Sequence, residues 1–150
     1  MSWVPCSGLD SAAGVVWLPR MLQKARRCLA SPDGRRVGEY LYGDNDFIDR
    51  EVIAFLRTDD ETISALVREN PSDADVARII VERSGRSASE CAAYSASLKR
   101  KFFNFIMIEA DEGRMRGFKA AIVKFLYNKA LMPVVYVMFR RDERKRKATA

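Results

Sequence analysis

The residues best suited to do chemistry gather between Gly38 and Asp49. The segment reads Gly38-Glu39-Tyr40-Leu41-Tyr42-Gly43-Asp44-Asn45-Asp46, followed by Asp49, so carboxylates and phenols stand beside a turn bounded by glycines. Such groups could hold a hard cation through oxygen or act as an acid and base pair. The spacing lacks the glycine and the glutamate that a calcium-binding loop requires. A helix capped by Asn45 or Asp46, with Asp49 in its first turn, accounts for most of these acids, so we expect no metal and no cofactor.

A second group of reactive residues is basic. Arg20, Lys24 and Arg27 recur at steps of four and three residues, which places them on one side of a helix. This stripe could lie in solvent, form ion pairs inside the fold with the acids of the segment above, or contact an anionic ligand. Exposed stripes and internal ion pairs are the common outcomes for such a pattern.

Several chemistries are excluded or unsupported by residue type alone. The chain has no histidine, which removes Ser-His, Cys-His and imidazole-metal sites. Its three cysteines, Cys6, Cys28 and Cys91, are far apart, with no C-x-x-C pair, which indicates reduced thiols and a cytoplasmic location. The first 18 residues do not resemble a secretory signal. No Walker, Rossmann or kinase loop is present, and we lean towards a protein that is not an enzyme.

The elements that must position these residues are mainly helical. Apolar residues at steps of three and four predict helices over about 18–30, 46–57, 59–69, 72–85 and 88–111. Ser72 and Ser87 each precede an acid by three residues, as in a capping box, and Asn70-Pro71 and Gly85 are stop signals. The predicted fold class is all-α: a compact bundle of about five to seven helices, with a short extended segment near 37–42. A loosely ordered lead-in over 1–16 precedes the helical domain, 17–113.

The C-terminal part differs in charge from everything before it. Residues 114–150 contain 11 Lys or Arg and 2 acids, a net charge of +9, whereas residues 1–113 carry −3. An apolar element is predicted over 114–139 and a basic tail over 140–150. The apolar run 118–139 is interrupted by lysines and by Pro133. Its apolar residues favour insertion into a bilayer by roughly 5 kcal/mol, and a single central lysine opposes insertion by about 3 kcal/mol. We therefore expect a core element or an interfacial segment, and not a membrane-spanning helix.

Three short motifs resemble a bacterial family catalogued only as a domain of unknown function. These are the stretch from Trp17 to Arg26, which contains Leu-Pro-Arg-Met, the Gly-Glu-Tyr-Leu-Tyr-Gly block at 38–43 and the helix at 49–56. Gln23 departs from the family pattern, which usually has Asp there, and the C-terminal run departs from its shorter members. The resemblance implies a small, intracellular, mainly helical domain. It marks as candidate functional residues Arg20, Lys24, Glu39, Tyr40 and Asp49.

These observations lead to one functional hypothesis and two alternatives. The leading one is a non-catalytic adaptor attached to the cytoplasmic face of a membrane, with anionic lipid or a protein as partner. The residues expected to contact the anionic surface are Arg140, Arg141, Arg144, Lys145, Arg146 and Lys147. The first alternative is a small enzyme that uses Glu39 or Asp49 beside Lys24 and Tyr40. The second is a nucleic-acid-associated protein that binds through its basic tail, although no recognisable RNA- or DNA-binding signature is present.

Overall fold

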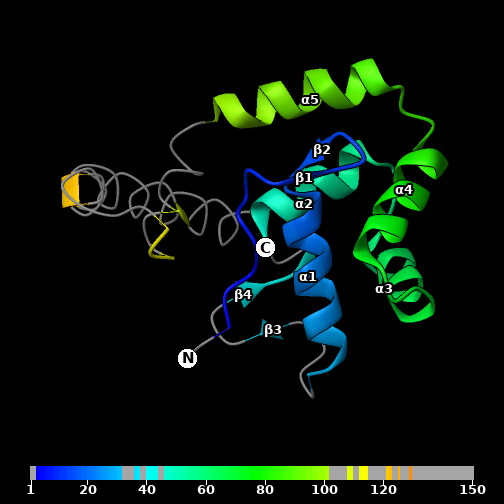
Figure 1. Ribbon diagram of the computed structural model, residues 1–150, viewed down its shortest axis with the longest axis horizontal. Coiled ribbons are helices and arrows are strands. Elements are labelled where there is room, and N and C mark those ends of the chain that lie inside the picture. The colour runs from blue at the N-terminus through cyan, green and yellow to red at the C-terminus, as the bar shows by residue number, and fades with distance from the viewer. Residues whose placement is uncertain are drawn as a thin grey trace, which may run out of the picture. The chain divides into compact units, whose positions relative to one another are not determined.

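The structure is a computed structural model that describes residues 3–31, 36–37, 40–43, 46–101, 108–109, 112–114, 121–122, 125 and 129. The chain divides into two compact units, Met1–Phe102 and Phe103–Ala150. The described elements are β1 (Ser11–Ala12), β2 (Val15–Val16), α1 (Leu18–Leu29), β3 (Arg36–Val37), β4 (Tyr40–Leu41), α2 (Phe47–Phe55), α3 (Asp60–Glu69), α4 (Asp73–Ser84) and α5 (Ala88–Arg100) (Figure 1). The described part is thus mainly helical, as predicted, with two small two-stranded sheets in addition.

Helix α1 is the centre of the first unit. It contacts α3, α4, β1 and β3, and Figure 1 shows these elements around it. Its apolar residues recur at steps of three and four and are fully buried: Leu18, Met21, Leu22, Ala25 and Cys28. The same core takes in Val52 of α2, Ile63 of α3 and Val76 of α4. The side of α1 that carries the basic stripe is therefore held in a fixed orientation.

The helix ends follow the local signals in the sequence. Asp46 and Asp59 cap α2 and α3, and Ser72 caps α4. Ser87 and Glu90 form a complete capping box at the start of α5. Asn70, which precedes Pro71, is the C-cap of α3, and Gly85 is the C-cap of α4, with a left-handed φ of 68°. The caps predicted at Asp46, Ser72 and Ser87 and the stop signals at Asn70 and Gly85 are confirmed, although at Ser72 the predicted box is present only as the cap from the serine hydroxyl.

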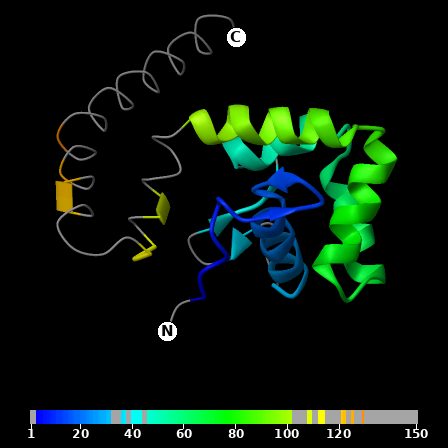
Figure 2. The same cartoon turned by 45° about the horizontal axis from the view of Figure 1, so that its top comes forward.

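Two short hairpins flank α1, with β1 and β2 at its N-terminal end and β3 and β4 along its side (Figure 1). Strands β3 and β4 form the short extended segment predicted near 37–42. Strands β1 and β2 pair across Ala13-Gly14, although the sequence indicated a loosely ordered lead-in over 1–16. The physical reason is burial, because Val15 and Val16 are at most 1% exposed, and α5 packs against β2 (Figure 2). The Ser95 hydroxyl of α5 fixes this contact: it donates to the Gly14 carbonyl at 2.8 Å and accepts from the Val16 amide at 3.1 Å.

Helix α5 is shorter than predicted. The sequence predicted a helix to about residue 111, but α5 ends at Arg100 and Lys101 caps it. The Lys101 ammonium pairs with the Glu51 carboxylate of α2 at 2.6 Å. The apolar periodicity continues past Arg100 and contains no Gly or Pro stop, which explains why the prediction ran on.

The second unit is described only in part. Ile108 and Glu109 are helical, Arg114 pairs with Glu109 at 3.6 Å, and Arg114 also pairs with Glu112. Ile122 and Phe125, three residues apart in helical conformation, are 42% and 62% exposed. None of the helices in the described part is long and apolar enough to cross a membrane. Most of the predicted apolar element over 114–139, and the whole basic tail over 140–150, lie outside the described residues.

Candidate functional site

Lys24 is the centre of a buried cluster that joins α1 to α2. Its side chain is 1% exposed. The ammonium donates a hydrogen bond to Oδ2 of Asp46 at 2.8 Å and lies 2.7 Å from Oδ1 of Asp49. Both acids stand at the N-terminus of α2, where Oδ1 of Asp46 also accepts from the amides of Ile48 and Asp49. One lysine therefore meets two carboxylates that the start of a helix already favours.

Asp49 is the most enclosed member of the cluster. Its side chain is 0% exposed and accepts a hydrogen bond from Nε1 of Trp17 at 2.7 Å and another from the Gly43 amide at 3.0 Å. Burial raises the pKa of the Asp49 carboxyl to about 6, because desolvation disfavours the charged form and outweighs the opposing effect of Lys24. The nearby Asp46 carboxylate raises this pKa further. Three donors on one carboxylate fix α2 against α1 and the β4–α2 connection.

The basic stripe of α1 lies among aromatic rings. The Arg20 guanidinium is 5.1 Å from the ring centroid of Trp17 and 5.4 Å from that of Tyr40. Tyr40 in turn meets Trp3 edge to face at 5.8 Å, and Arg27 lies 5.8 Å from the Trp3 ring. Cations near aromatic faces are attracted by the ring quadrupole, by about 0.5–2 kcal/mol each depending on burial. Arg20, at 3% exposure, is thus part of the packed interior.

The cluster requires a glycine at position 43, because there is no room for a side chain there. The φ of Gly43 is 69°, and a Cβ at this position would overlap the Asp60 carboxylate. Its amide is the donor that Asp49 uses. The neighbouring Tyr42 is buried, and burial together with the charge of Asp60 raises the pKa of its phenol above the usual range. The turn in the acidic segment is therefore built around two internal carboxylates.

Four of the five candidate residues come together in the structure. Arg20, Lys24, Tyr40 and Asp49 belong to one connected cluster, while Glu39 lies outside the described residues. Sequence reasoning did not include Trp17 as a partner of Asp49. Trp17 precedes α1 with a left-handed φ of 74°, and no sequence signal indicates that conformation for a tryptophan. The six tail residues expected at an anionic surface are also outside the described residues.

The Lys24–Asp49 pair at the centre of the cluster has almost no access to solvent, whereas Asp46 at its edge is 24% exposed. Lys24, Asp49 and Trp17 are each at most 1% exposed, whereas a general acid or base must reach its substrate. A hollow of about 280 Å³ is lined by Trp3, Gln23, Arg26, Arg27, Ala30 and Asp73. Neither Lys24 nor Asp49 is among these lining residues. Within the described ranges, no group of three or more His, Cys, Asp or Glu residues could hold a metal ion. The geometry is that of an internal ion pair that positions helices.

A family model with the description "Domain of unknown function (DUF5069)" matches residues 3–124. No curated protein and no solved structure matches the chain. The matched range contains the whole described cluster and stops before the basic tail at 140–150.

Proposed function

We propose that this chain, which belongs to the family described as Domain of unknown function (DUF5069), is a non-catalytic binding module held at an anionic membrane surface by its C-terminal segment. The observation that carries the proposal is the division of charge. Residues 114–150 have a net charge of +9, whereas residues 1–113 have −3. A surface of anionic lipid is the partner that such a segment complements over its whole length.

The energetics of attachment favour the combination of charge with exposed apolar side chains. Each Lys or Arg near an anionic leaflet contributes about 1 kcal/mol, so the six basic residues from Arg140 to Lys147 supply on the order of 6 kcal/mol. Ile122 and Phe125, three positions apart and each in helical conformation, are 42% and 62% exposed, so their exposed area can be buried in the interface. Two weak signals together give stable attachment where one is marginal.

The burial of Lys24 and Asp49 supports a role other than catalysis. The charged groups of the Lys24 cluster are satisfied by one another and by Trp17 and Gly43. The enzyme alternative keeps one favourable observation, the 2.7 Å approach of Lys24 to an Asp49 carboxyl with a raised pKa. Burial of both groups speaks against that alternative, because no substrate atom can lie beside them without opening the core.

Co-sedimentation with liposomes tests the proposal. The full chain should pellet with vesicles of anionic phospholipid and remain in solution with vesicles of phosphatidylcholine. A variant with all six tail residues from Arg140 to Lys147 changed to Gln should lose most of this binding. A matched variant, in which each of the six is exchanged between Arg and Lys, keeps the charge and should pellet like the wild type. A chain ending at Gly113 should also remain in solution.

Two results would count against membrane attachment. Equal pelleting of the full chain and the Gln variant would show that the tail charge does not hold the protein on lipid. Failure to pellet, together with retardation of RNA or DNA that falls steeply with salt, would favour the nucleic-acid alternative.

Changing Ile122 and Phe125 to Ser, with the exposed Phe47→Ser variant as control, isolates the apolar contribution.

A further inference from the structure

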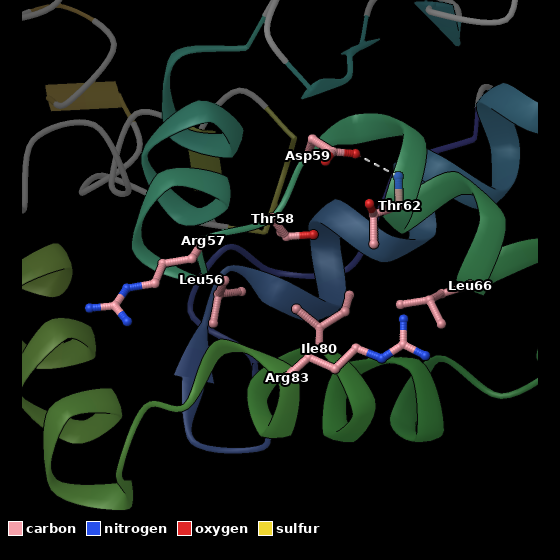
Figure 3. Close-up of a pocket in the computed structure, with 8 residues that line it drawn as sticks. All are labelled: Leu56, Arg57, Thr58, Asp59, Thr62, Leu66, Ile80 and Arg83. Carbon is pink, nitrogen blue, oxygen red and sulfur yellow. Dashed lines mark hydrogen bonds between the residues drawn. The ribbon is translucent and has the colours of Figure 1, made fainter.

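A second hollow lies between the end of α2, the start of α3 and α4. Its volume is about 190 Å³, and its lining residues, drawn in Figure 3, are Leu56, Arg57, Thr58, Asp59, Thr62, Leu66, Ile80 and Arg83. None of them belongs to the Lys24 cluster. The apolar part of the lining consists of core side chains: Leu56, Leu66 and Ile80 are only 1%, 4% and 2% exposed, so a ligand meets just their outermost atoms. We call this hollow the Arg83 pocket.

The rim of the Arg83 pocket is polar and carries more positive than negative charge. The charged lining residues are two arginines, Arg57 and Arg83, and one aspartate, Asp59. The Asp59 carboxylate already accepts a hydrogen bond from the Thr62 amide at 2.7 Å, which holds it at the α3 cap. In the part of the chain that the structure describes, neither arginine forms an ion pair. Other arginines there do so, as Arg26 does with Asp73.

The two arginines are not equivalent. Figure 3 shows the Arg83 side chain running past Ile80 so that its guanidinium lies beside Leu66, whereas the Arg57 guanidinium points to the opposite side, away from Arg83. An anion at the Leu66 end would therefore meet Arg83. The hydroxyl groups of Thr58 and Thr62 are further hydrogen-bond donors on the same rim, whereas the N-terminus of α3 is already occupied by its Asp59 cap and carries Asp60 and Glu61 in its first turn.

Size and chemistry together define the class of ligand. In another protein an apolar cavity of about 150 Å³ accepts benzene, so about 190 Å³ holds one ring with a small polar head. Guanidinium groups pair best with carboxylates and phosphates, and the singly charged carboxylate suits better a rim that also holds the Asp59 carboxylate. We propose that the Arg83 pocket binds a small organic carboxylate whose carboxylate pairs with Arg83 and whose apolar body packs on Leu56, Leu66 and Ile80.

Benzoate is the probe that tests this site, with the full chain in solution. Titration is followed by NMR of the Ile and Leu methyl groups, and saturable shifts are expected at Leu56, Leu66 and Ile80. A ligand of this size should bind with a dissociation constant of about 1 mM. Benzamide has the same shape without the charge and should bind about tenfold more weakly.

Variants assign the charge to one side chain. Arg83→Gln should weaken benzoate binding about tenfold, and Arg83→Lys should restore part of the loss. Both changes are at an exposed side chain, so the fold is expected to persist. Arg68→Gln is the matched control, because Arg68 is an exposed arginine of α3 outside the pocket, and it should leave binding unchanged.

Three results would overturn the proposal. One is the absence of saturable shifts at benzoate concentrations up to about 20 mM, well above the expected dissociation constant. Another is equal binding of benzoate by wild type and Arg83→Gln, or equal binding of benzoate and benzamide. The third is a set of shifted methyl groups away from Leu56, Leu66 and Ile80. None of these measurements involves lipid, so the outcome is independent of membrane attachment.

Discussion

Changing Lys24 to Met isolates the buried ion pair at the centre of the fold. The substitution keeps a long apolar side chain in the space and removes the ammonium that lies 2.7 Å from Asp49 and 2.8 Å from Asp46. Asp46 is 24% exposed and can be hydrated, but Asp49 is 0% exposed. Its carboxylate would then depend on two neutral donors, Trp17 and Gly43.

The magnitude follows from that burial. Removing one partner of a buried ion pair costs about 3–5 kcal/mol, because the remaining charge is left without compensation. Whole domains of this size are stable by about 5–15 kcal/mol. Because Asp49 can instead take up a proton, at about 1.4 kcal/mol per pH unit above its pKa of about 6, we expect Lys24→Met to lower the free energy of unfolding at pH 7 by about 2–3 kcal/mol. Urea unfolding followed by tryptophan fluorescence measures this value, since Trp17 is buried beside the pair.

The chain contains a matched control for burial. Lys101 and Glu51 lie 2.6 Å apart, as close as Lys24 and Asp49, but their side chains are 48% and 28% exposed. Exposed pairs of this kind contribute about 0–1 kcal/mol, so Lys101→Met should lower the free energy of unfolding by no more than about 1 kcal/mol. The difference between the two Lys→Met variants reports the effect of burial on a lysine–carboxylate pair.

The same variant has a pH dependence with a defined sign. The pKa of Asp49 is raised in the folded state from 3.8 to about 6, so the folded protein binds the proton more tightly than the unfolded chain does. The stability that this proton contributes is present below pH 3.8 and is lost as the pH rises through about 6. Without Lys24 the pKa of Asp49 rises further. The deficit of Lys24→Met should therefore be smaller at pH 5 than at pH 8, by at least about 1 kcal/mol.

Two outcomes would refute this reasoning. A loss for Lys24→Met as small as that for Lys101→Met would show that Asp49 is not held as a buried anion. A deficit of the same size at pH 5 and pH 8 would show that the Asp49 carboxyl does not titrate in this window. Adding Asp49→Asn to Lys24→Met should remove the pH dependence of the deficit, because the titrating group is gone.

The remaining predictions concern single contacts and use the same urea assay. Arg26 donates to the Asp73 carboxylate at 2.7 and 2.9 Å and to two backbone carbonyls near 3 Å. An ammonium group cannot reach all of these acceptors, so Arg26→Lys should lower the free energy of unfolding by about 1–2 kcal/mol. A loss below about 0.5 kcal/mol would show that the contacts contribute little. Ser87→Ala removes the capping box of α5 and should cost about 1 kcal/mol, while the exposed Ser97→Ala should cost nothing; equal effects would contradict the capping role.

Features that depend on neighbours within four residues could be predicted from the sequence. The caps Asp46, Asp59, Ser72 and Ser87 bond to amides two or three positions ahead of them, so the residue types suffice. The hairpin at Ser11–Val16 could not be predicted in this way. Its strands have two residues each, too few to show alternation, and Ala13 adopts a φ of 47° that few alanines adopt.

The partners within the candidate site required the tertiary fold. The sequence left the basic stripe with three outcomes, and spacing alone cannot choose among them, because Lys24 and Asp49 are 25 positions apart in the chain. The choice follows from packing: α1 is buried along Leu18, Met21 and Ala25, which turns Lys24 towards the start of α2. Arg27, on the same stripe, is exposed and meets Trp3 instead.

Capping and ion pairing, which the sequence presented as separate explanations, are combined in one carboxylate. Oδ1 of Asp46 caps α2 through two amides, and Oδ2 accepts from Lys24. The first-turn acid Asp49 likewise takes donors from Trp17 and Gly43 while it pairs with Lys24. The acids of the 38–49 segment that the structure describes are therefore used inside the fold. Residues 114–150, by contrast, contain 11 basic residues and only 2 acids, so this segment cannot balance its charge from within, and the proposed attachment to an anionic surface rests on this excess.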